Sequence, residues 1–318
     1  MKKVLILSFD RDPHVLAVCS HLQTGNYFLL NTDKISERYQ ISFSSKTSIY
    51  TVKDLNEDRT LALDSSWNIW NRRIVDPEMP TNIPRDLAKI VADETKKTLQ
   101  GMLLAHRGKV VNYPSHEYLA RSKLHQISLA STLNHYIRVP STLVTNNPDE
   151  LRAFYEAHQG NVCFKLQKGA IADIGDKKMT VLTSKVKPEH LSDESLLRQS
   201  PILFQEYIDK EYEVRATVIG QEVIGTAIHS QEAEISRVDY RRYDFSVPYK
   251  KLKLPVYVQE FCLAMLESYG LYFGAFDFIV TKEKNFVFLE LNSNGQWLWL
   301  EQLSGSRISK SLADYLIK

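Results

Sequence analysis

Two apolar strands that carry acidic side chains near the end of the chain restrict its fold most strongly. The segment FGAFDFIVTKEKNFVFLELN, residues 273–292, alternates apolar and polar positions on either side of the polar turn KEKN. This pattern is typical of a β-hairpin. A turn centred in KEKN pairs Val280 with Val287. The same register places Asp277 directly opposite Glu290, so the sequence predicts an antiparallel sheet with two facing carboxylates.

Two carboxylates that face each other across strands repel each other. The two-residue period of a strand places Asn292 on the face of Glu290, so three oxygen-bearing side chains meet there. A hard cation would relieve the repulsion, and oxygen ligands without a nearby His or Cys favour Mg²⁺ over zinc. Asp277, Glu290 and Asn292 are therefore the candidate metal ligands. The alternative is a solvated strand face whose acids discourage edge aggregation.

Composition is that of an ordinary globular protein. The 318 residues, 43% of them apolar and 25% charged, suit two or three subdomains that share a cleft. A formal charge of +2 excludes the broad positive field of nonspecific nucleic-acid binding. No apolar stretch approaches the roughly 20 residues of a membrane span, and Cys19, Cys163 and Cys262 are odd in number and widely spaced. We therefore expect a cytoplasmic protein with reduced, buried thiols and no nucleic-acid or membrane partner.

The first part of the chain predicts an α/β domain. Strand-like segments VLILSF, YFLLN and WNIWNRRI alternate with helical segments near residues 14–22 and 87–104. Such alternation is typical of a mostly parallel sheet. The turn NYPS at residues 112–115 then begins a helix that carries Arg121 and Lys123, and it marks the first domain boundary.

The rest of the chain predicts a small α+β domain followed by an antiparallel sheet. IRVPSTLV and NVCFKLQ have the character of strands around a helix that opens at Pro148. From Pro201 onward strands dominate, in ILFQEYI, YEVRATVIG and EVIGTAIHS, before a helix from about 256 to 269 and the hairpin. The expected bounds are 1–111 for the N-terminal α/β domain, 112–200 for the central α+β domain and 201–318 for the C-terminal antiparallel-sheet domain.

Lys165 lies in the apolar strand VCFKLQ, which would not normally carry a lysine, so an anionic partner is implied. Phosphate is a good candidate because KGAIADIG follows directly, and glycine-bearing loops let backbone N–H groups approach phosphate oxygens. The alternative is a lysine that snorkels out of its strand.

Arginines mark two further candidate positions. Arg215 lies inside the apolar strand YEVRATVIG, where a guanidinium requires a carboxylate or phosphate held bidentately. The alternative is structural pairing with an acid of this chain. Farther along, Asp239, Arg241 and Arg242 lie in a polar, aromatic-rich loop that suits either a functional site or a solvated charge cluster. The apolar stretch GQWLWL, residues 295–300, suits a base-stacking platform or a helix packed under the active site, and we favour the helix.

The order of these motifs resembles the ATP-grasp fold over about residues 112–318. The matching features are Lys123, Lys165 with its loop, QEYI, the strand arginine and the Asp…Glu-x-Asn ending. Within that superfamily, IHSQ, DYRR and LELNSNGQWLWLE resemble the ligases that cyclise graspetides, the microviridin-type ribosomal peptides. Ser293 stands where family members often have proline, and DYRR stands where DWRR is common; the metal-binding asparagine is kept.

The resemblance implies a role for each candidate residue. The implied nucleotide ligands are Lys123 and Lys165 for the phosphates, Gln205, Glu206, Tyr207 and Ile208 around the adenine, and Glu211 or Glu213 for the ribose. Arg215, with Arg241 or Arg242, would clamp the γ-phosphate and the incoming carboxylate. Asp277, Glu290 and Asn292 would hold one or two Mg²⁺ ions. Asp239 is the candidate base where the nucleophile is a hydroxyl.

The implied activity is ATP-dependent ring closure in a peptide, with ATP and Mg²⁺ as cofactors and ATP in the cleft between the last two domains. A side-chain carboxylate would become an acyl phosphate, which a hydroxyl or amine then attacks to give an ester or an amide. The implied partners are a ribosomal precursor peptide with a leader and a second copy of the chain in a homodimer. The alternatives are an ATP-grasp ligase that extends a protein tail or joins small molecules, and a non-catalytic nucleotide-binding or peptide-binding scaffold.

Overall fold

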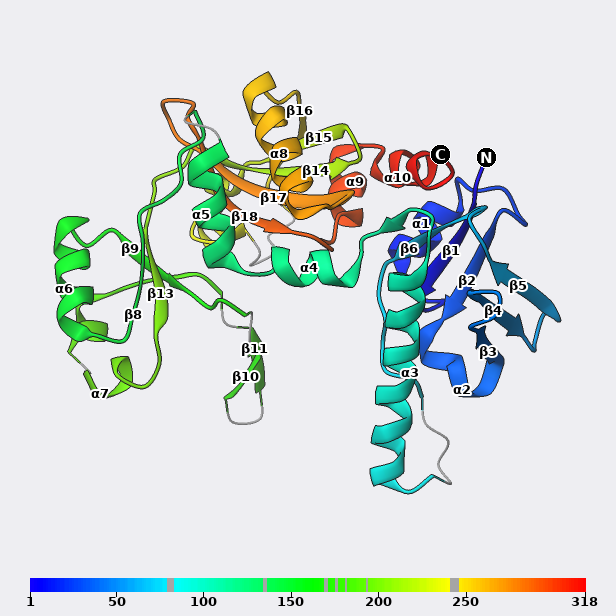
Figure 1. Ribbon diagram of the computed structural model, residues 1–318. Coiled ribbons are helices and arrows are strands. Elements are labelled where there is room, and N and C mark those ends of the chain that lie inside the picture. Colours follow the sequence, from blue (N-terminus) through cyan, green and yellow to red (C-terminus); the bar gives the residue numbers. More distant parts are fainter. Residues whose placement is uncertain are drawn as a thin grey trace.

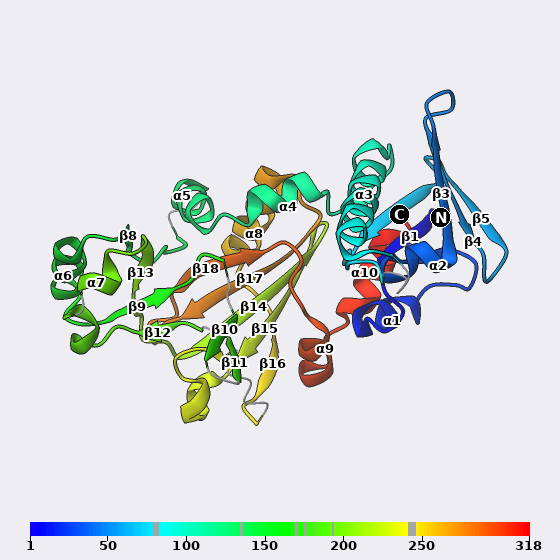
Figure 2. The same cartoon turned by 90° about the horizontal axis from the view of Figure 1, so that it is seen from below.

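A computed structural model describes the chain apart from residues 79–82, 134–135, 169–170, 175–176, 181, 193 and 241–245. The elements form three groups in a row (Figure 1). A five-stranded sheet lies in the middle, the N-terminal sheet lies at one end, and a smaller four-stranded sheet lies at the other. Figure 2 shows the same order from below. The expected combination of α/β and α+β parts with a C-terminal antiparallel sheet is confirmed.

The N-terminal sheet is parallel, as the alternating pattern predicts. Its strands lie in the order β2-β1-β6-β7, with bounds β1 Lys3–Ser8, β2 Tyr27–Asn31, β6 Trp67–Asn71 and β7 Val110–Val111. Helix α1 (Pro13–Cys19) begins beside β1 because the carboxylate of Asp12 accepts a hydrogen bond from the backbone N–H of His14 at 2.9 Å. The long helix α3 (Arg85–Ala105) packs on the sheet through Met102, near its C-terminal end.

A three-stranded antiparallel sheet in the same region was not predicted. Its strands are β3 (Tyr39–Ser44), β4 (Ile49–Asp54) and β5 (Arg59–Leu63). Most of their side chains are at least partly exposed, so the apolar alternation that identifies a strand is weak. Ser48 and Asp58 supply the positive φ angles of the turn regions, so the glycine that usually marks a hairpin is missing.

The middle part of the sequence contains the smaller four-stranded sheet. Its elements are α4 Pro114–Ala120, α5 Lys123–Leu133, β8 Thr142–Thr145, α6 Pro148–Ala157, β9 Val162–Lys165, β10 Ile171–Ile174, β11 Lys177–Thr180, β12 Ser184–Lys185, α7 Glu194–Leu197 and β13 Ile202–Glu206. The sheet has the order β12-β9-β13-β8, and β10 pairs only with β11. Because β13 pairs with both β8 and β9, we propose that the central domain continues to Glu206.

One helix that carries both Arg121 and Lys123 was predicted, and this prediction was wrong. Helix α4 ends at Ala120, and α5 begins at Lys123. Ser122 lies in the break, where its hydroxyl accepts a hydrogen bond from the backbone N–H of His125 at 3.4 Å. A serine that satisfies the first N–H groups of a helix favours a new start there.

The five-stranded sheet is antiparallel and holds the main core. Its strands lie in the order β16-β15-β14-β17-β18, with bounds β14 Tyr212–Ile219, β15 Glu222–Ile228, β16 Tyr249–Leu252, β17 Phe273–Val280 and β18 Phe286–Asn292. Helix α8 (Val256–Tyr269) has the predicted bounds and ends at Gly270, which has a φ of 65°. Phe261 of α8 packs edge to face on Phe278 and Phe288 of the sheet.

The register of the β17–β18 hairpin confirms part of the prediction. Asp277 pairs with Glu290, as expected, but Val280 pairs with Phe286 and not with Val287. The register changes next to Asp277, and Leu289 has no partner across the hairpin. Such a β-bulge turns the following residues relative to the strand, and bulges are frequent beside active sites.

The end of the chain returns to the N-terminal sheet. Helices α9 (Leu298–Ser304) and α10 (Ile308–Leu316) share one apolar cluster with Val4 and Trp70. The remaining short helices are α2 Ile35–Arg38 and the 3₁₀ turns Thr32–Lys34, Pro188–Leu191, Ser230–Glu232 and Glu234–Ser236. Among the described helices, none combines the length and apolar character that a membrane span needs.

Candidate active site

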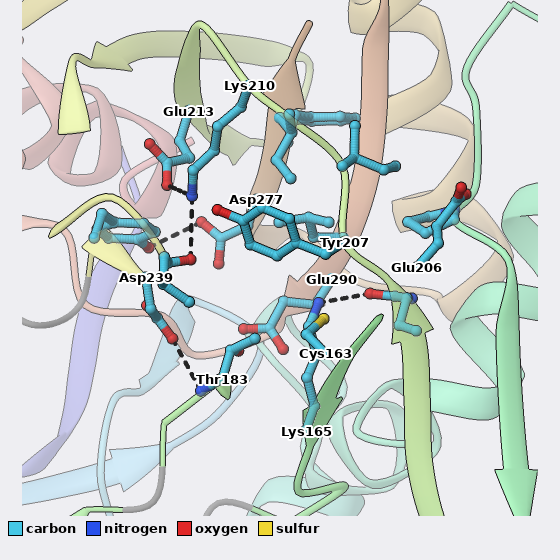
Figure 3. Close-up of a pocket in the computed structure, with 18 of the residues that line it drawn as sticks. Cys163, Lys165, Thr183, Glu206, Tyr207, Lys210, Glu213, Asp239, Asp277 and Glu290 are labelled. Atoms are coloured by element: carbon cyan, nitrogen blue, oxygen red, sulfur yellow. Dashed lines mark hydrogen bonds and ion pairs between the residues drawn. The ribbon is translucent and has the colours of Figure 1, made fainter. Parts of the chain in front are cut away.

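A cleft opens between the smaller four-stranded sheet and the five-stranded sheet (Figure 3). Its volume is about 1060 Å³ with the open solvent at its mouth included. The predicted site residues that line it are Lys123, Lys165, Gln205, Glu206, Tyr207, Ile208, Glu213, Asp239, Asp277 and Glu290. Residues from five different strands, two loops and one helix therefore meet in one place.

The two facing carboxylates both line this cleft. Asp277 accepts hydrogen bonds from Arg215 Nη1 at 2.6 Å and from the Tyr240 hydroxyl at 3.0 Å. Glu290 accepts a hydrogen bond from Lys123 Nζ. Burial opposes the charge of Arg215, but the adjacent Asp277 carboxylate outweighs it and holds the pKa of Arg215 above its ordinary value. The repulsion expected between the acids is thus balanced by two cations of the chain.

The donor atoms suit a hard divalent cation. Asp277 and Glu290 supply carboxylate oxygens, and Asn292 follows on the same strand with an exposed side chain. The side-chain oxygen of Asn292 accepts a hydrogen bond from the backbone N–H of Asn294 at 3.1 Å, which fixes its orientation. Within the described part of the chain, no group of three or more His, Cys, Asp or Glu residues forms a metal site. Two carboxylates and an amide fit Mg²⁺, because Mg²⁺ keeps several water or phosphate ligands.

The two candidate phosphate lysines approach the cleft from different elements. Lys123 is the first residue of α5, and Lys165 is the last residue of β9. Lys165 Nζ donates a hydrogen bond to Gln205 Oε1 at 2.6 Å. Gly169 and Gly175, in the loop after Lys165, lie outside the described residues.

The residues expected around the adenine belong to the strand end at β13. The carboxylate of Glu206 accepts hydrogen bonds from Ser141 N at 2.8 Å and from Arg138 Nη2 at 2.6 Å. The Tyr207 ring lies 3.7 Å from Lys185 Nζ, measured to the ring centroid. These contacts fix the segment that lines the cleft before β14 begins.

The two candidate ribose ligands, Glu211 and Glu213, lie in different places in the structure. Glu213 lines the cleft and is buried. Glu211 lies away from it and pairs with Lys284 in the hairpin turn, at 2.6 Å. Two glutamates that are two residues apart in one strand would point to the same face. Here only Glu213 belongs to β14, because the strand begins at Tyr212, after Glu211.

Comparisons with known proteins agree with this geometry. Residues 3–117 match the MvdD pre-ATP grasp domain, and residues 113–316 match the RimK-like ATP-grasp domain. The chain belongs to the RimK-like ATP-grasp family. It is an ATP-grasp ligase, and its fold is the expected one. No curated protein matches the chain.

Several solved structures resemble this ligase over its whole length. One is a RiPP-associated ATP-grasp ligase from Chryseobacterium gregarium, solved in complex with ADP and a leader and core peptide. It is 26% identical to this chain with a TM-score of 0.88, and the match covers 99% of this chain and 96% of the C. gregarium chain. The macrocyclase MdnC from Microcystis aeruginosa, bound with precursor peptide MdnA, is 25% identical with a TM-score of 0.84 and 99% coverage of both chains. The macrocyclase MdnB from the same organism is 30% identical with a TM-score of 0.77, covering 100% of this chain and 99% of its own. The resemblance to microviridin-type ligases is confirmed.

Among the cleft residues that sequence reasoning missed, two have side chains that bind the predicted acids. Lys210 donates hydrogen bonds to the carboxylate of Glu213 and, at 3.2 Å, to the carbonyl of Val238. Burial raises the pKa of Glu213, although Lys210 and the Ser230 hydroxyl favour its charged form. Lys210 was overlooked because it stands in the polar run DKEYE, which has the character of a solvated loop. Tyr240, noted only as part of DYRR, donates its hydroxyl to Asp277.

The loop after β15 is described in part. Asp239 is buried and accepts a hydrogen bond from the backbone N–H of Thr183 at 3.3 Å. Arg241 and Arg242 lie outside the described residues, so their roles stay predictions. The preference for a helix at GQWLWL is confirmed for its second half, because α9 begins at Leu298. Trp299 of this helix stacks on Tyr240 with ring centroids 6.0 Å apart.

Proposed function

We propose that this ATP-grasp ligase uses Mg-ATP to activate Asp or Glu side chains of a ribosomal precursor peptide and closes rings with Thr or Ser hydroxyls or Lys amines. The observation that carries the proposal is full-length similarity to ligases solved with such peptides. The C. gregarium ligase holds ADP and a leader and core peptide, and MdnC holds its precursor peptide. Both cover at least 96% of their own length, so the similarity includes the N-terminal domain.

We place the nucleotide in the cleft. Lys123 and Lys165 would bind its phosphates, because both ammonium groups reach the cleft from separate elements. Segment 205–208 would contact the adenine, and Glu213 would accept the ribose hydroxyls. Lys210 supports this role because its ammonium group donates a hydrogen bond to the Glu213 carboxylate and favours its charged form, although burial raises the pKa of Glu213.

Asp277, Glu290 and Asn292 would hold Mg²⁺. A Mg²⁺ ion held there would supply positive charge against the negative charge that develops during phosphoryl transfer. Lys123, which pairs with Glu290 in this structure, would turn toward the phosphates. Arg215 is fixed beside the same acids by Asp277, so its guanidinium is oriented before any substrate arrives.

The proposed reaction has two steps. First, a carboxylate oxygen of the peptide attacks the γ-phosphorus, the bond to the bridging oxygen of ADP breaks, and an acyl phosphate forms. Second, a hydroxyl or amine of the peptide attacks the acyl carbon, the carbon–oxygen bond to phosphate breaks, and the nucleophile loses a proton. Arg215, with Arg241 or Arg242, would stabilise the transferring phosphoryl group. Asp239, on the wall of the cleft, is our candidate base for a hydroxyl.

Peptide-dependent ADP release tests this proposal. The purified ligase is incubated with ATP, Mg²⁺ and a candidate precursor peptide, and ADP and the peptide mass are measured together. Ring closure predicts ADP release and the loss of one water per ring. A gain in peptide mass would identify a tail-adding ligase instead, and no ADP release with any precursor would favour a non-catalytic scaffold. Hydroxyl-specific and amine-specific precursor variants then separate ester rings from amide rings.

A further inference from the structure

We propose that Arg72 of the N-terminal domain is a positioning residue for the metal site. It holds the turn 293–295, which directly follows the metal ligand Asn292, against the guanidinium of Arg215. This inference rests on the proposed Mg-ATP function of the cleft. Among the described residues, none from the N-terminal domain lines the cleft. The inference therefore gives this domain an indirect role, through the position of the metal site.

Arg72 reaches the turn by a reciprocal pair of hydrogen bonds. Its Nη1 donates to Asn294 Oδ1 at 2.8 Å, and Asn294 Nδ2 donates to the backbone carbonyl of Arg72 at 2.8 Å. The side chain of Arg72 is 2% exposed, so water competes little for these bonds. Asn294 is therefore fixed at both polar atoms of its amide by one residue of another domain.

The N-terminal sheet builds this position from its strand ends. Asp12 follows β1 and Arg72 follows β6, and the carboxyl ends of adjacent parallel strands lie at the same edge. Asp12 Oδ2 lies 3.2 Å from Arg72 Nε. His14 Nε2 accepts hydrogen bonds from the backbone N–H groups of Trp297 and Leu298, both at 3.3 Å. Arg72 thus holds one end of segment 294–298, and His14 holds the other.

Structural stability alone does not explain the arginine. Arg72 Nε and Nη2 are buried without a hydrogen-bond partner among the described residues, although the Asp12 carboxylate forms an ion pair with Nε. Glu117, which lines the same small cavity, also has a buried oxygen without a partner there. Burying these unsatisfied groups costs free energy that the ion pair with Asp12 has to offset, so the arginine is not optimised for stability. Such a cost is typical of residues that serve a site.

The turn transmits its position to the catalytic side chains because it is tightly packed. Asn112 holds its first residue, donating a hydrogen bond to the carbonyl of Ser293 at 2.8 Å. At Gly295, a Cβ atom would lie 2.5 Å from Arg215 Nη2, so the backbone lies directly on the guanidinium. A turn released by the loss of Arg72 would therefore move against Arg215 on one side and displace Asn292 on the other.

Mg²⁺-dependent binding of the non-hydrolysable analogue AMPPNP tests the inference, measured by calorimetry over a series of Mg²⁺ concentrations. The variants are Arg72→Met and the milder Asn294→Ala, which keeps the buried arginine in case Arg72→Met does not fold. We expect both to raise the half-saturating Mg²⁺ concentration about 10–100-fold, the usual effect of losing a partner that orients a metal ligand. Arg38→Met is the control, because it breaks another N-terminal arginine–aspartate pair, with Asp54, away from this edge.

A second readout separates positioning from general destabilisation. In hydrogen exchange without nucleotide, Arg72→Met and Asn294→Ala should speed exchange of the amides in 293–298 and leave those of β14 unchanged. Wild-type Mg²⁺ dependence in a folded Asn294→Ala or Arg72→Met variant overturns the inference and leaves the proposed function intact. Failure of the wild-type ligase to bind AMPPNP with Mg²⁺ overturns both. An equal loss in Arg38→Met also overturns the inference, because it shows that any weakening of the domain has the same effect.

Discussion

At the scale of single residues, the two facing acids of the hairpin differ in how much each contributes to the stability of the fold. Asp277 is buried against Arg215, and its loss would leave a guanidinium inside the protein without its counter-charge. Glu290 pairs with Lys123 where both side chains are more than a fifth exposed. Water can replace part of the second interaction but little of the first.

This difference predicts unequal stability changes. Asp277→Ala should lower the free energy of unfolding by about 3–5 kcal/mol, because it leaves a buried charge unpaired. Glu290→Gln should lower it by about 1 kcal/mol or less. Urea unfolding followed by circular dichroism measures both values. Equal losses would show that the Arg215–Asp277 pair is not buried as described, and Glu290→Gln is accordingly the better variant for testing chemistry.

Glu117 gives a pH-dependent prediction. Burial raises its pKa to about 7 from an ordinary 4.5, although Arg121 lowers it in part, so the folded protein favours the neutral acid. Wild-type stability should therefore fall as pH rises from about 4.5 through about 7, where the buried acid must ionise. Glu117→Gln should remove this loss and be more stable than wild type by about 1–3 kcal/mol at pH 8, with a smaller difference at pH 5.

Thermal unfolding at several pH values measures the effect. Glu222→Gln, at an exposed position of β15, is the matched control and should change neither the stability nor its pH dependence. A Glu117→Gln protein whose stability relative to wild type is the same at pH 5 and pH 8 would contradict the prediction.

At the scale of elements, the bulge in β18 decides which face carries the metal ligands. Without the bulge, Leu289 and not Glu290 would face Asp277, since a one-residue shift turns side chains to the opposite face of a sheet. Deleting Leu289 would remove the extra residue and keep Glu290 opposite Asp277, because Phe278 and Phe288 already pair on the turn side of the bulge. We expect the deletion to retain Mg²⁺-dependent nucleotide binding, as Leu289→Ala should. Loss of binding in a folded deletion variant would show that the site depends on the bulge itself and not only on the facing pair.

The same hairpin shows what sequence alone predicts. Its alternating pattern gives both strands, because local periodicity determines them, but it does not give the register. Near the turn Val280 pairs with Phe286, one position from its predicted partner, and the bulge at Leu289 then brings Glu290 opposite Asp277 as predicted. The separation of Glu211 from Glu213 depends on where β14 begins, a boundary that the apolar pattern does not locate. Arg72 and Asn294 are 222 residues apart, and no spacing rule connects them.

At the scale of the whole molecule, the N-terminal domain and the end of the chain form one body. Val4 and Trp70 share an apolar cluster with Leu312 of α10, and the backbone N–H of Lys2 donates to the carbonyl of Ile317 at 2.9 Å. Figures 1 and 2 show α10 against the N-terminal sheet in both views. The smaller four-stranded sheet is at the far end, so the cleft has one wall joined to the N-terminal domain and one wall away from it. The order of the motifs predicts the family, but no local sequence pattern predicts that α10 packs against the N-terminal sheet.

The central claim is that this ligase closes rings in a peptide with Mg-ATP at the cleft that holds Asp277 and Glu290. The most direct test is the intact mass of a precursor peptide after incubation with ATP and Mg²⁺ and either wild-type ligase or Glu290→Gln. We predict that the wild-type product loses the mass of one water per ring and that the folded Glu290→Gln ligase leaves the peptide unchanged. Water loss at the wild-type rate with Glu290→Gln would contradict the account.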